Sequence, residues 1–301
     1  MKNTAKQKII VIVGPTASGK SDLAVLLAQK FNGEVVSADS RQVYKGLDIG
    51  TGKITRREMR GIPHHLLDVA SPKRTYTASH FARDGRRAIK KIGVRGRIPI
   101  VVGGTGFYIR ALVDDISIPE VPPNMKLRTE LEKKNVRELY RMLFRLDRAR
   151  AKTIERKNPR RLIRAIEIAK ALGKVPPLTH GAYAYKALWI GIQTDDKILK
   201  QKIRMRLFAR IRAGMIAEAR RLHSGGLSWK RMESLGLEYR FLAQFLRKKI
   251  TRMELEEKLS AAIWQYARRQ KTWFKKNKEI RWISSPKNKM ARKWIMEFLK
   301  K

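Results

Sequence analysis

A glycine-rich octet directly follows a run of five apolar residues near the start of the chain. Gly14-Pro15-Thr16-Ala17-Ser18-Gly19-Lys20-Ser21 matches the phosphate-loop pattern G-x-x-x-x-G-K-[ST]. The run Ile9–Val13 predicts a strand buried on both faces, and residues 21–31 predict a helix. Such a loop binds phosphate because its N–H groups turn inward and the helix amino terminus adds partial positive charge. The chain is therefore expected to belong to the α/β class.

The octet also assigns roles to individual side chains. All eight residues from Gly14 to Ser21 are candidates for holding a pyrophosphate or a nucleotide, and the pattern alone does not say which. Lys20 is expected to reach a terminal phosphate. The Ser21 hydroxyl is the expected ligand of a Mg²⁺ cofactor.

Two further strands end in turns that carry polar or glycine residues. Residues 34–38 predict a short strand that ends at Asp39, and residues 98–102 predict an apolar strand that runs into Gly103-Gly104-Thr105-Gly106, with a helix to Val113. Strand, turn and helix repeated in this order predict a doubly wound parallel sheet of the P-loop type. Ligands bind such sheets beyond the carboxyl ends of the strands, where these turns meet.

The middle of the chain differs from its ends. Prolines interrupt residues 119–123, and the next stretch is helical and basic, with 17 Lys or Arg against 6 Asp or Glu over residues 121–180, a net charge of +11. We predict a first core part over 1–120, a helical insertion over 121–185 and a mostly helical second core part over 186–301, which opens with a strand at 187–192. The expected apolar positions of the insertion are Leu139, Leu143, Leu146, Leu162, Ile166 and Ala169.

Charge and composition narrow the partners. The formal net charge is +43, from 69 Lys plus Arg against 26 Asp plus Glu, which attracts polyanions such as nucleic acid, although a general basic bias of the proteome is an alternative cause. Hydrophobic residues make up 43% of the chain, enough for a folded core. Cysteine is absent, which excludes disulfides and thiolate metal sites. The amino-terminal apolar run is too short for a signal peptide or membrane span, so we expect a cytoplasmic protein without membrane association.

Asp39 lies on the carboxyl edge of the strand predicted at residues 34–38. P-loop kinases and ATPases usually hold Mg²⁺ with an acid at the end of a second strand, but here the strand at 98–102 runs into glycines. Asp39 could cap a helix, or it could act as a general base opposite the phosphate loop.

Several motifs together resemble bacterial tRNA dimethylallyltransferases. Besides the phosphate loop, they are residues 39–51 (DSRQVYKGLDIGT), 63–68 (PHHLLD), 102–106 (VGGTG), 158–167 (NPRRLIRAIE), 236–240 (GLEYR) and 268–273 (RRQKTW). They follow the order of the family over nearly the whole chain. A phosphate loop alone is shared by many enzymes, whereas this combination is highly specific.

The resemblance implies a prenyl transfer. The phosphate loop would hold the diphosphate of dimethylallyl diphosphate, and Asp39 would take a proton from an adenine amine, which is a poor nucleophile. Arg206 aligns with the arginine that stabilises the departing diphosphate, with neighbouring Arg204 as a rival. Thr105 aligns with a residue that contacts the target adenosine, and it could also cap the following helix.

The resemblance further implies a tRNA substrate and a monomeric enzyme. The target would be adenosine 37, beside the anticodon, in tRNAs reading codons that begin with U, and this base must leave the stack of the anticodon loop to react. About half of the insertion's arginines are expected to touch phosphate. The residues that align with tRNA-contacting segments are Asp39, Ser40, Arg41, Gln42, Thr105, Arg128, Arg160, Arg161, Leu162, Ile163, Arg164, Gly236, Tyr239 and Arg240.

Other readings stay open. A prenyltransferase of free adenine nucleotides, a small-molecule kinase and a non-enzymatic RNA chaperone would each share part of these features. The zinc finger of eukaryotic relatives is excluded without cysteine, and the GLEYR block is longer than the Gly-Tyr-Arg version of some members. The pair His64-His65 is interpreted as structural or substrate-lining. The tryptophans Trp264, Trp273, Trp282 and Trp294 are interpreted as core residues of carboxyl-terminal helices.

Overall fold

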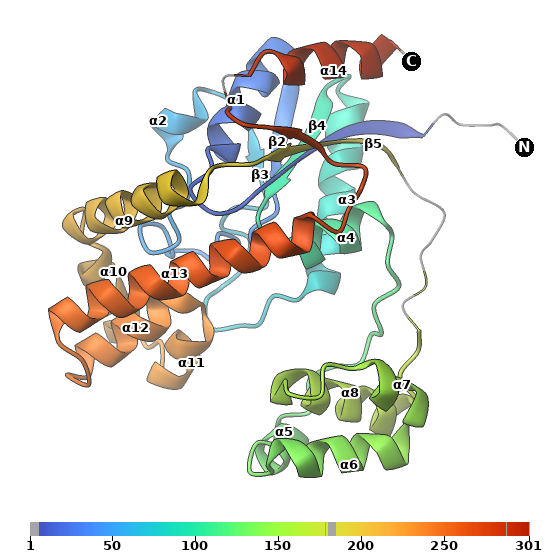
Figure 1. The fold of residues 1–301 in the computed structure, drawn as a ribbon, viewed down its shortest axis with the longest axis vertical. Coiled ribbons are helices and arrows are strands. Elements are labelled where there is room, and N and C mark those ends of the chain that lie inside the picture. The colour runs from blue at the N-terminus through green and yellow to red at the C-terminus, as the bar shows by residue number, and fades with distance from the viewer. Residues whose placement is uncertain (1–5, 178, 180–184, 287, 301) are drawn as a thin grey trace, which may run out of the picture. The chain divides into compact units, whose positions relative to one another are not determined.

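A six-stranded, entirely parallel sheet organises most of the molecule (Figure 1). The computed structural model describes residues 6–177, 179, 185–286 and 288–300. The strands lie in the order β3-β2-β4-β1-β5-β6. Their bounds are β1 Gln7–Val13, β2 Gly33–Ser37, β3 His64–His65, β4 Ile98–Gly103, β5 Tyr185–Ile192 and β6 Arg281–Ile283. The predicted doubly wound sheet is therefore confirmed, and the two short edge strands β3 and β6 are additions to the prediction.

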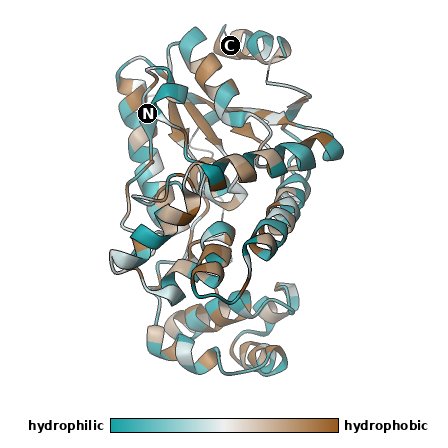
Figure 2. Ribbon diagram, turned by 90° about the vertical axis from the view of Figure 1, so that its left-hand side faces the viewer, coloured by the Kyte–Doolittle hydropathy of each residue, from teal (hydrophilic) through white to brown (hydrophobic). Residues whose placement is uncertain are grey.

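The central strand β1 shows why the apolar run folds in this way. Ile9, Val11 and Val13 face one side of the sheet, and Ile10 and Ile12 face the other, because successive strand side chains alternate. Helices α3 (Ala78–Val94) and α4 (Gly106–Val113) cover the first side, and α1 (Lys20–Lys30) and α14 (Met290–Lys300) cover the second. Figure 2 shows the strands in brown between helices that carry teal on their outer sides. Both faces of the strand are buried, so the sequence contains no polar alternation.

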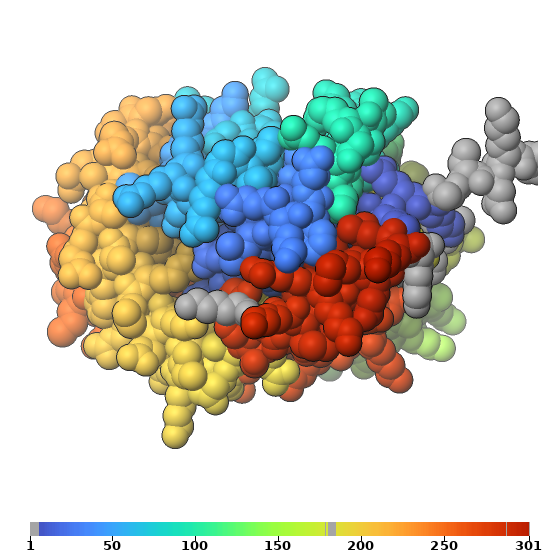
Figure 3. Space-filling view, turned by 90° about the horizontal axis from the view of Figure 1, so that it is seen from above, coloured from blue at the N-terminus to red at the C-terminus, as the bar shows by residue number. Residues whose placement is uncertain are grey.

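A second apolar core lies among the helices that follow β5. It gathers side chains from these helices with Val43, Tyr44 and Leu47 of the segment after β2. The helices are α9 Asp196–Arg212, α10 Met215–Ser224, α11 Trp229–Ser234, α12 Leu237–Leu246 and α13 Arg252–Phe274. The short helix α2 (Arg56–Met59) begins at Thr55 with a capping box to Glu58. Figure 3 shows α14 in red beside blue residues of the amino-terminal part of the chain. Helix α14 therefore packs against the same core as β1 and α1.

The basic insertion forms a compact unit of its own, beginning at Ile116 rather than at residue 121, while residue 185 already belongs to β5. Its helices are α5 Met125–Leu131, α6 Val136–Leu146, α7 Arg148–Thr153 and α8 Pro159–Leu172. Leu139, Leu143, Leu162 and Ile166 are fully buried, as predicted. Leu146, another apolar position of the helical pattern, is 38% exposed. It is the last residue of α6, where the chain turns away at Asp147.

Candidate active site

The phosphate loop connects β1 to α1 and has the backbone that the glycines allow. Gly14 and Gly19 have φ angles of 152° and 87°, which glycine adopts without strain. A side chain at Gly19 would also meet the ring of Pro286, 2.6 Å from the position of a Cβ atom. Among the described residues, the Ser18 hydroxyl is buried without a hydrogen-bond partner. A buried polar atom of this kind fits a loop that receives an anionic ligand.

Lys20 lies where three charged groups converge. Its Nζ atom donates a hydrogen bond to the Pro15 carbonyl oxygen at 2.6 Å. Burial, and then the positive charge of Arg206, lower the pKa of Lys20 to about 8, while the negative charge of Asp39 opposes this shift. The structure thus brings Arg206 of the distant helix α9 near Lys20 and Asp39.

Asp39 leaves the carboxyl end of β2 and does not cap a helix. Its Oδ1 atom accepts a hydrogen bond from the Arg41 amide at 2.8 Å, and the residues that follow form turns. The helix-cap reading is therefore wrong, because no helix starts here. The neighbouring strand approaches closely, since a Cβ atom on Gly103 would lie 2.1 Å from the Ala38 carbonyl oxygen. Gly103 is thus required for the close approach of the two strand ends.

Thr105 is hydrogen-bonded to Ser40, the residue that follows Asp39. The Ser40 amide donates a hydrogen bond to Thr105 Oγ1 at 3.1 Å, and the Thr105 amide bonds to the Ala38 carbonyl oxygen at 3.3 Å. Thr105 occupies the N-cap position of α4, but its side chain makes no capping hydrogen bond. The expected capping role of the side chain was wrong because the hydroxyl is engaged with Ser40 instead.

Arg206 and Arg204 lie in different surroundings on α9. Partial burial, and then the positive charge of the adjacent Arg210, lower the pKa of Arg206. Arg206 lies near the turn at Gly52, where a Cβ atom would be 3.4 Å from the Arg206 Nη2 atom. The guanidinium of Arg204 instead lies 5.4 Å from the ring centre of Phe208. Of the two rivals, Arg206 is the one that lies near Lys20.

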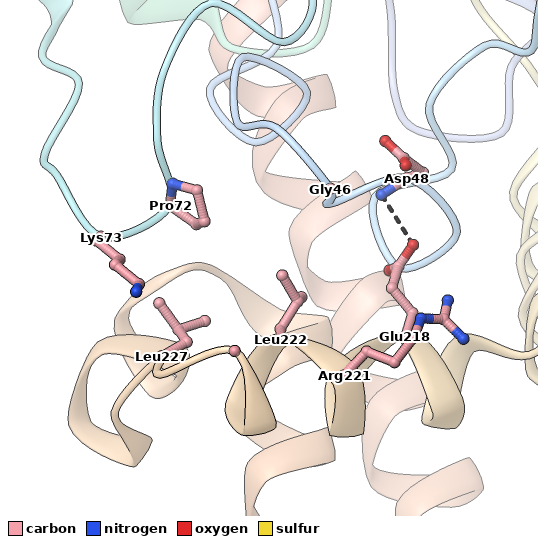
Figure 4. A pocket seen from close by; sticks show the side chains of 9 residues that line it. Gly46, Asp48, Pro72, Lys73, Glu218, Arg221, Leu222 and Leu227 are labelled. Carbon is pink, nitrogen blue, oxygen red and sulfur yellow. Dashed lines mark hydrogen bonds between the residues drawn. The ribbon is translucent and has the colours of Figure 1, made fainter.

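A buried carboxylate that carried no sequence prediction holds the loop between Asp39 and α2. Glu218 of α10 is 4% exposed and accepts hydrogen bonds from the amides of Asp48, Ile49 and Gly50 at 2.7–3.0 Å. Figure 4 shows Glu218 pointing from its helix to this loop, beside an open cavity of about 330 Å³. The sequence could have indicated this burial, because Glu218 lies on the same helix face as the buried Met215 and Ala219.

Tyr239 belongs to the same buried cluster. It is 1% exposed, and its hydroxyl donates a hydrogen bond to Glu218 Oε1 at 2.6 Å. The side chain is therefore packed in the helical core, and its predicted contact with tRNA does not fit this structure. The aromatic ring in the GLEYR block supports the loop rather than offering a surface to RNA.

The other expected tRNA contacts of the larger unit lie partly or fully exposed. Arg41 Nη1 bonds weakly to the Ser234 carbonyl oxygen at 3.5 Å, and its side chain packs against Gly236. Gln42 Nε2 donates to the Gly52 carbonyl oxygen at 3.4 Å. Arg240 is exposed, with its guanidinium 5.8 Å from the Phe241 ring centre.

In the insertion, the expected tRNA contacts divide into three kinds. Arg160 and Arg161 are exposed at the start of α8, and Arg161 pairs with the exposed Glu155. Leu162 and Ile163 are buried in the core of the unit, so their side chains are not available to an RNA. The third kind is a pair of arginines held by a buried acid.

That acid is Glu167 of α8, which is 2% exposed. It accepts two hydrogen bonds at 2.8 Å from Arg128 and one at 2.7 Å from Arg164. Burial opposes the ionised form, but the hydrogen bonds from Arg128 and Arg164 lower the pKa of Glu167 below its ordinary value. Both arginines therefore have fixed guanidinium groups, about a third of each side chain remaining exposed.

The expected Mg²⁺ site at Ser21 offers few protein ligands. In the described part of the chain, no group of three or more His, Asp or Glu side chains could surround an ion. The Ser21 hydroxyl is exposed at the end of the phosphate loop, and no hydrogen bond among the described residues occupies it. This arrangement fits a Mg²⁺ ion that takes most of its ligands from substrate phosphates and water.

Other residues singled out by the sequence serve the packing. His65 Nε2 lies 2.6 Å from Glu34 Oε2, and His64 Nδ1 lies 2.8 Å from the Ile62 carbonyl oxygen, so both are structural. Trp264, Trp282 and Trp294 pack partly buried against the cores, although Trp282 lies in β6 and not in a helix. Trp273 is 36% exposed, so its interpretation as a core residue was wrong.

None of the helices within residues 6–177, 185–286 and 288–300 is long and apolar enough to cross a bilayer.

Comparisons with known proteins agree on one family. The family model described as IPP transferase matches residues 42–277, and the model described as isopentenyl transferase matches residues 7–75. A protein of Treponema denticola named tRNA dimethylallyltransferase 2 is 42% identical, with 92% of this chain and 96% of that protein covered. One of Carboxydothermus hydrogenoformans named tRNA dimethylallyltransferase is 38% identical, with 95% and 94% covered.

Solved structures give the same result. The tRNA isopentenylpyrophosphate transferase of Bacillus halodurans is 33% identical and superposes with a TM-score of 0.74, covering 98% of this chain and 97% of that one. A eukaryotic dimethylallyltransferase described as acting on tRNA is 28% identical, with a TM-score of 0.73 over 89% and 70% of the two chains. Since the first family model spans most of the chain and relatives match it almost end to end, the chain belongs to the IPP transferase family.

Proposed function

We propose that this protein transfers the dimethylallyl group of dimethylallyl diphosphate to N6 of adenosine 37 in tRNAs that read codons beginning with U, and releases diphosphate. One observation carries the proposal: Asp39 follows β2 and the phosphate loop with Lys20 follows β1, at the same edge of one parallel sheet, and Asp39 and Arg206 both lie close enough to Lys20 to shift its pKa. A base and two cations at one place are what this transfer needs. The relatives named tRNA dimethylallyltransferase support the choice of donor and acceptor.

The diphosphate would lie in the phosphate loop. Lys20 and Arg206 would bind its oxygens and stabilise the negative charge that grows on it as the bond to the prenyl carbon breaks. The buried, unpartnered Ser18 hydroxyl would gain an acceptor in this position. A Mg²⁺ ion held through Ser21 and the diphosphate would neutralise further charge on the leaving group.

Asp39 would act on the acceptor. The lone pair of the adenine amine is delocalised into the ring, so the amine must lose a proton as it attacks. The bond from prenyl carbon C1 to N6 forms, the bond from C1 to the diphosphate oxygen breaks with its electron pair staying on that oxygen, and the N6 proton passes to the Asp39 carboxylate. The Thr105 hydroxyl, which is bonded to the neighbour of Asp39, would orient the target adenine.

The charge of the chain suits a tRNA acceptor. The insertion carries a net charge of +11 over residues 121–180, and Glu167 holds two of its arginines in fixed positions. A target base inside an anticodon loop would be turned out of the stack to enter the site, while such arginines bind the phosphates of the loop. A free nucleotide would have no use for this unit.

The proposal is tested by offering different donors and acceptors to one preparation of the protein. With Mg²⁺, dimethylallyl diphosphate and an unmodified tRNA that has adenosine 37, nucleoside mass spectrometry should find dimethylallyladenosine. A tRNA with guanosine 37 is the matched control and should stay unchanged. Product on AMP but not on tRNA would assign the protein to the nucleotide prenyltransferases, and transfer of the ATP γ-phosphate would make it a kinase.

A further inference from the structure

A single buried amide connects the two glycine-rich turns of the candidate active site. Gln270 of α13 is 5% exposed. Its Oε1 atom accepts a hydrogen bond from the Thr16 amide of the phosphate loop at 2.8 Å, and its Nε2 atom donates one to the Gly104 carbonyl oxygen at 2.9 Å. Both ends of the side chain are thus bound to backbone, one in the loop for the donor and one in the turn that carries Thr105.

The turn at Gly104 is shaped around this amide. A Cβ atom on Gly104 would lie 2.2 Å from Gln270 Nε2, which no real side chain tolerates. The same position would lie 3.8 Å from the Gly14 carbonyl oxygen, so the two turns are already close to contact. Gly104 is therefore needed for the close approach of Gln270, and the close approach sets the spacing of the turns.

Gln270 is the middle member of a row on one face of α13. Tyr266, Gln270 and Trp273 are separated by four and three residues, a spacing that places them side by side on a helix. Gln270 meets Gly104, and a Cβ atom on Gly106 would lie 2.1 Å from the Trp273 Nε1 atom. Two members of the row therefore lie against the glycines of the 104–106 turn.

Tyr266 completes the row at Thr105. Burial and the nearby negative charge of Asp39 raise the pKa of Tyr266 to about 12, while a hydrogen bond with the Thr105 side chain opposes the shift. One side chain of α13 thus faces each residue of the turn, and the row ends beside the proposed base.

The amide is chemically suited to this place. A carboxamide can accept from an N–H group with its oxygen and donate to a carbonyl group with its nitrogen while it stays uncharged. A glutamate would still accept from Thr16, but its carboxylate would face the Gly104 carbonyl oxygen and add negative charge beside the diphosphate site. An apolar side chain would leave the Thr16 amide and the buried Gly104 carbonyl oxygen without these hydrogen bonds, which destabilises both turns.

We propose that Gln270 is a positioning residue that holds the phosphate loop and the Thr105 turn in register, so that the prenyl carbon and the acceptor amine meet at reacting distance. The inference rests on the proposed function, since it names what Gln270 does for that transfer. It touches neither substrate. Its amide occupies the Thr16 N–H group, so this group is not available to the diphosphate and the loop keeps one shape. Misplacement of reacting groups by about 1 Å can cost about 100-fold in rate.

The test compares Gln270→Met with Gln265→Met in the full-length protein. Methionine has nearly the shape of glutamine without its hydrogen bonds, and Gln265 is an exposed residue of the same helix. We expect Gln270→Met to lower kcat for prenylation at least 10-fold, while its affinity for tRNA in a filter-binding assay and the KM for tRNA change less than twofold. Gln265→Met should match the wild type in all three measurements. Wild-type kcat in folded Gln270→Met would overturn the inference.

A second variant covers the case in which Gln270→Met does not fold. Gln270→Glu has the same size, and its carboxyl group can donate to Gly104 only when it carries a proton. Its activity relative to the wild type should therefore rise as the pH falls. An activity ratio that does not change between pH 9 and pH 6 would overturn the inference. Absence of prenylation by the wild-type protein would instead count against the proposed function.

Discussion

The Tyr239 hydroxyl donates a 2.6 Å hydrogen bond to the buried carboxylate of Glu218. That carboxylate in turn holds three consecutive backbone amides of the loop that follows Asp39. The pair therefore connects the helical core to the loop beside Arg206. A residue that the family resemblance places at the tRNA surface is a structural support in this chain.

Replacing Tyr239 with phenylalanine should lower stability and leave RNA binding intact. The change removes one hydrogen bond from a buried charge and should cost about 1–3 kcal/mol of unfolding free energy. Thermal and urea unfolding measure this loss. The affinity for tRNA should stay within twofold of the wild type, and a large loss of affinity in a variant of unchanged stability would restore Tyr239 to the tRNA-binding residues.

Removing the Asp39 carboxylate should affect the rate far more than binding. Asp39→Asn keeps the size and can still accept the Arg41 N–H bond, but it cannot take the amine proton. We expect kcat to fall by about 100-fold to 10,000-fold, the usual contribution of a general base. A variant that mainly loses affinity for tRNA would contradict the assignment. Ser40→Ala is a neighbouring control for disturbance of the turn.

Arg206→Ala and Arg204→Ala form a matched pair on one helix. Arg206 lies near Lys20, whereas Arg204 packs on Phe208. Loss of Arg206 should lower kcat by about 100-fold or more, because its charge acts on the departing diphosphate. Loss of Arg204 should change kcat less than about threefold. Equal losses from both would mean that the helix contributes only a general positive field.

The titration of Lys20 should be visible in the pH dependence of kcat/KM. Its pKa is lowered to about 8, so the ammonium is charged below this pH and becomes neutral as the pH rises through it. The ratio kcat/KM for dimethylallyl diphosphate reports the free enzyme and should fall above about pH 8. Bound diphosphate favours the ammonium, so the corresponding limb of kcat should lie at higher pH. In Lys20→Arg the limb near pH 8 should disappear.

Glu167→Gln should lower the stability of the insertion and its affinity for tRNA. The change removes the charge that holds Arg128 and Arg164, and it should lower both thermal stability and tRNA affinity. Because the pKa of Glu167 is lowered on folding, its stabilising effect is present above the ordinary carboxyl pKa and is lost as the pH falls through the lowered value. Glu155→Gln, at an exposed pair with Arg161, is the control and should change stability by less than about 1 kcal/mol. If both variants bind tRNA like the wild type, the insertion's arginines do not depend on Glu167.

Local patterns predicted the central elements correctly. The runs at Ile9–Val13 and at residues 98–102 are apolar throughout, so the sequence alone predicted β1 and β4. The glycine-rich motif predicted the phosphate loop that follows β1. The edge strands β3 and β6 were missed because two or three residues carry no periodicity, and their pairing depends on β2 and β5 being present.

Long-range contacts explain the remaining differences. Arg128 and Arg164 look like free basic residues until Glu167 is placed between them. Tyr239 looks exposed in a polar segment until α12 packs on α10. Gln270 looks like one more polar residue of a basic helix, and only the folded structure shows that both ends of its amide are bonded to backbone. Residues far apart in the chain have to be brought together before such roles can be seen.

The Pro286 ring that lies against Gly19 has a consequence for the order of biosynthesis. On the ribosome the phosphate loop is made well before two of the groups that lie against it, since Gln270 follows Thr16 by 254 residues and Pro286 comes later still. A nascent chain therefore carries an unfinished pocket while the residues between them are translated. Competence for diphosphate should arise only after Gln270 and Pro286 have left the exit tunnel.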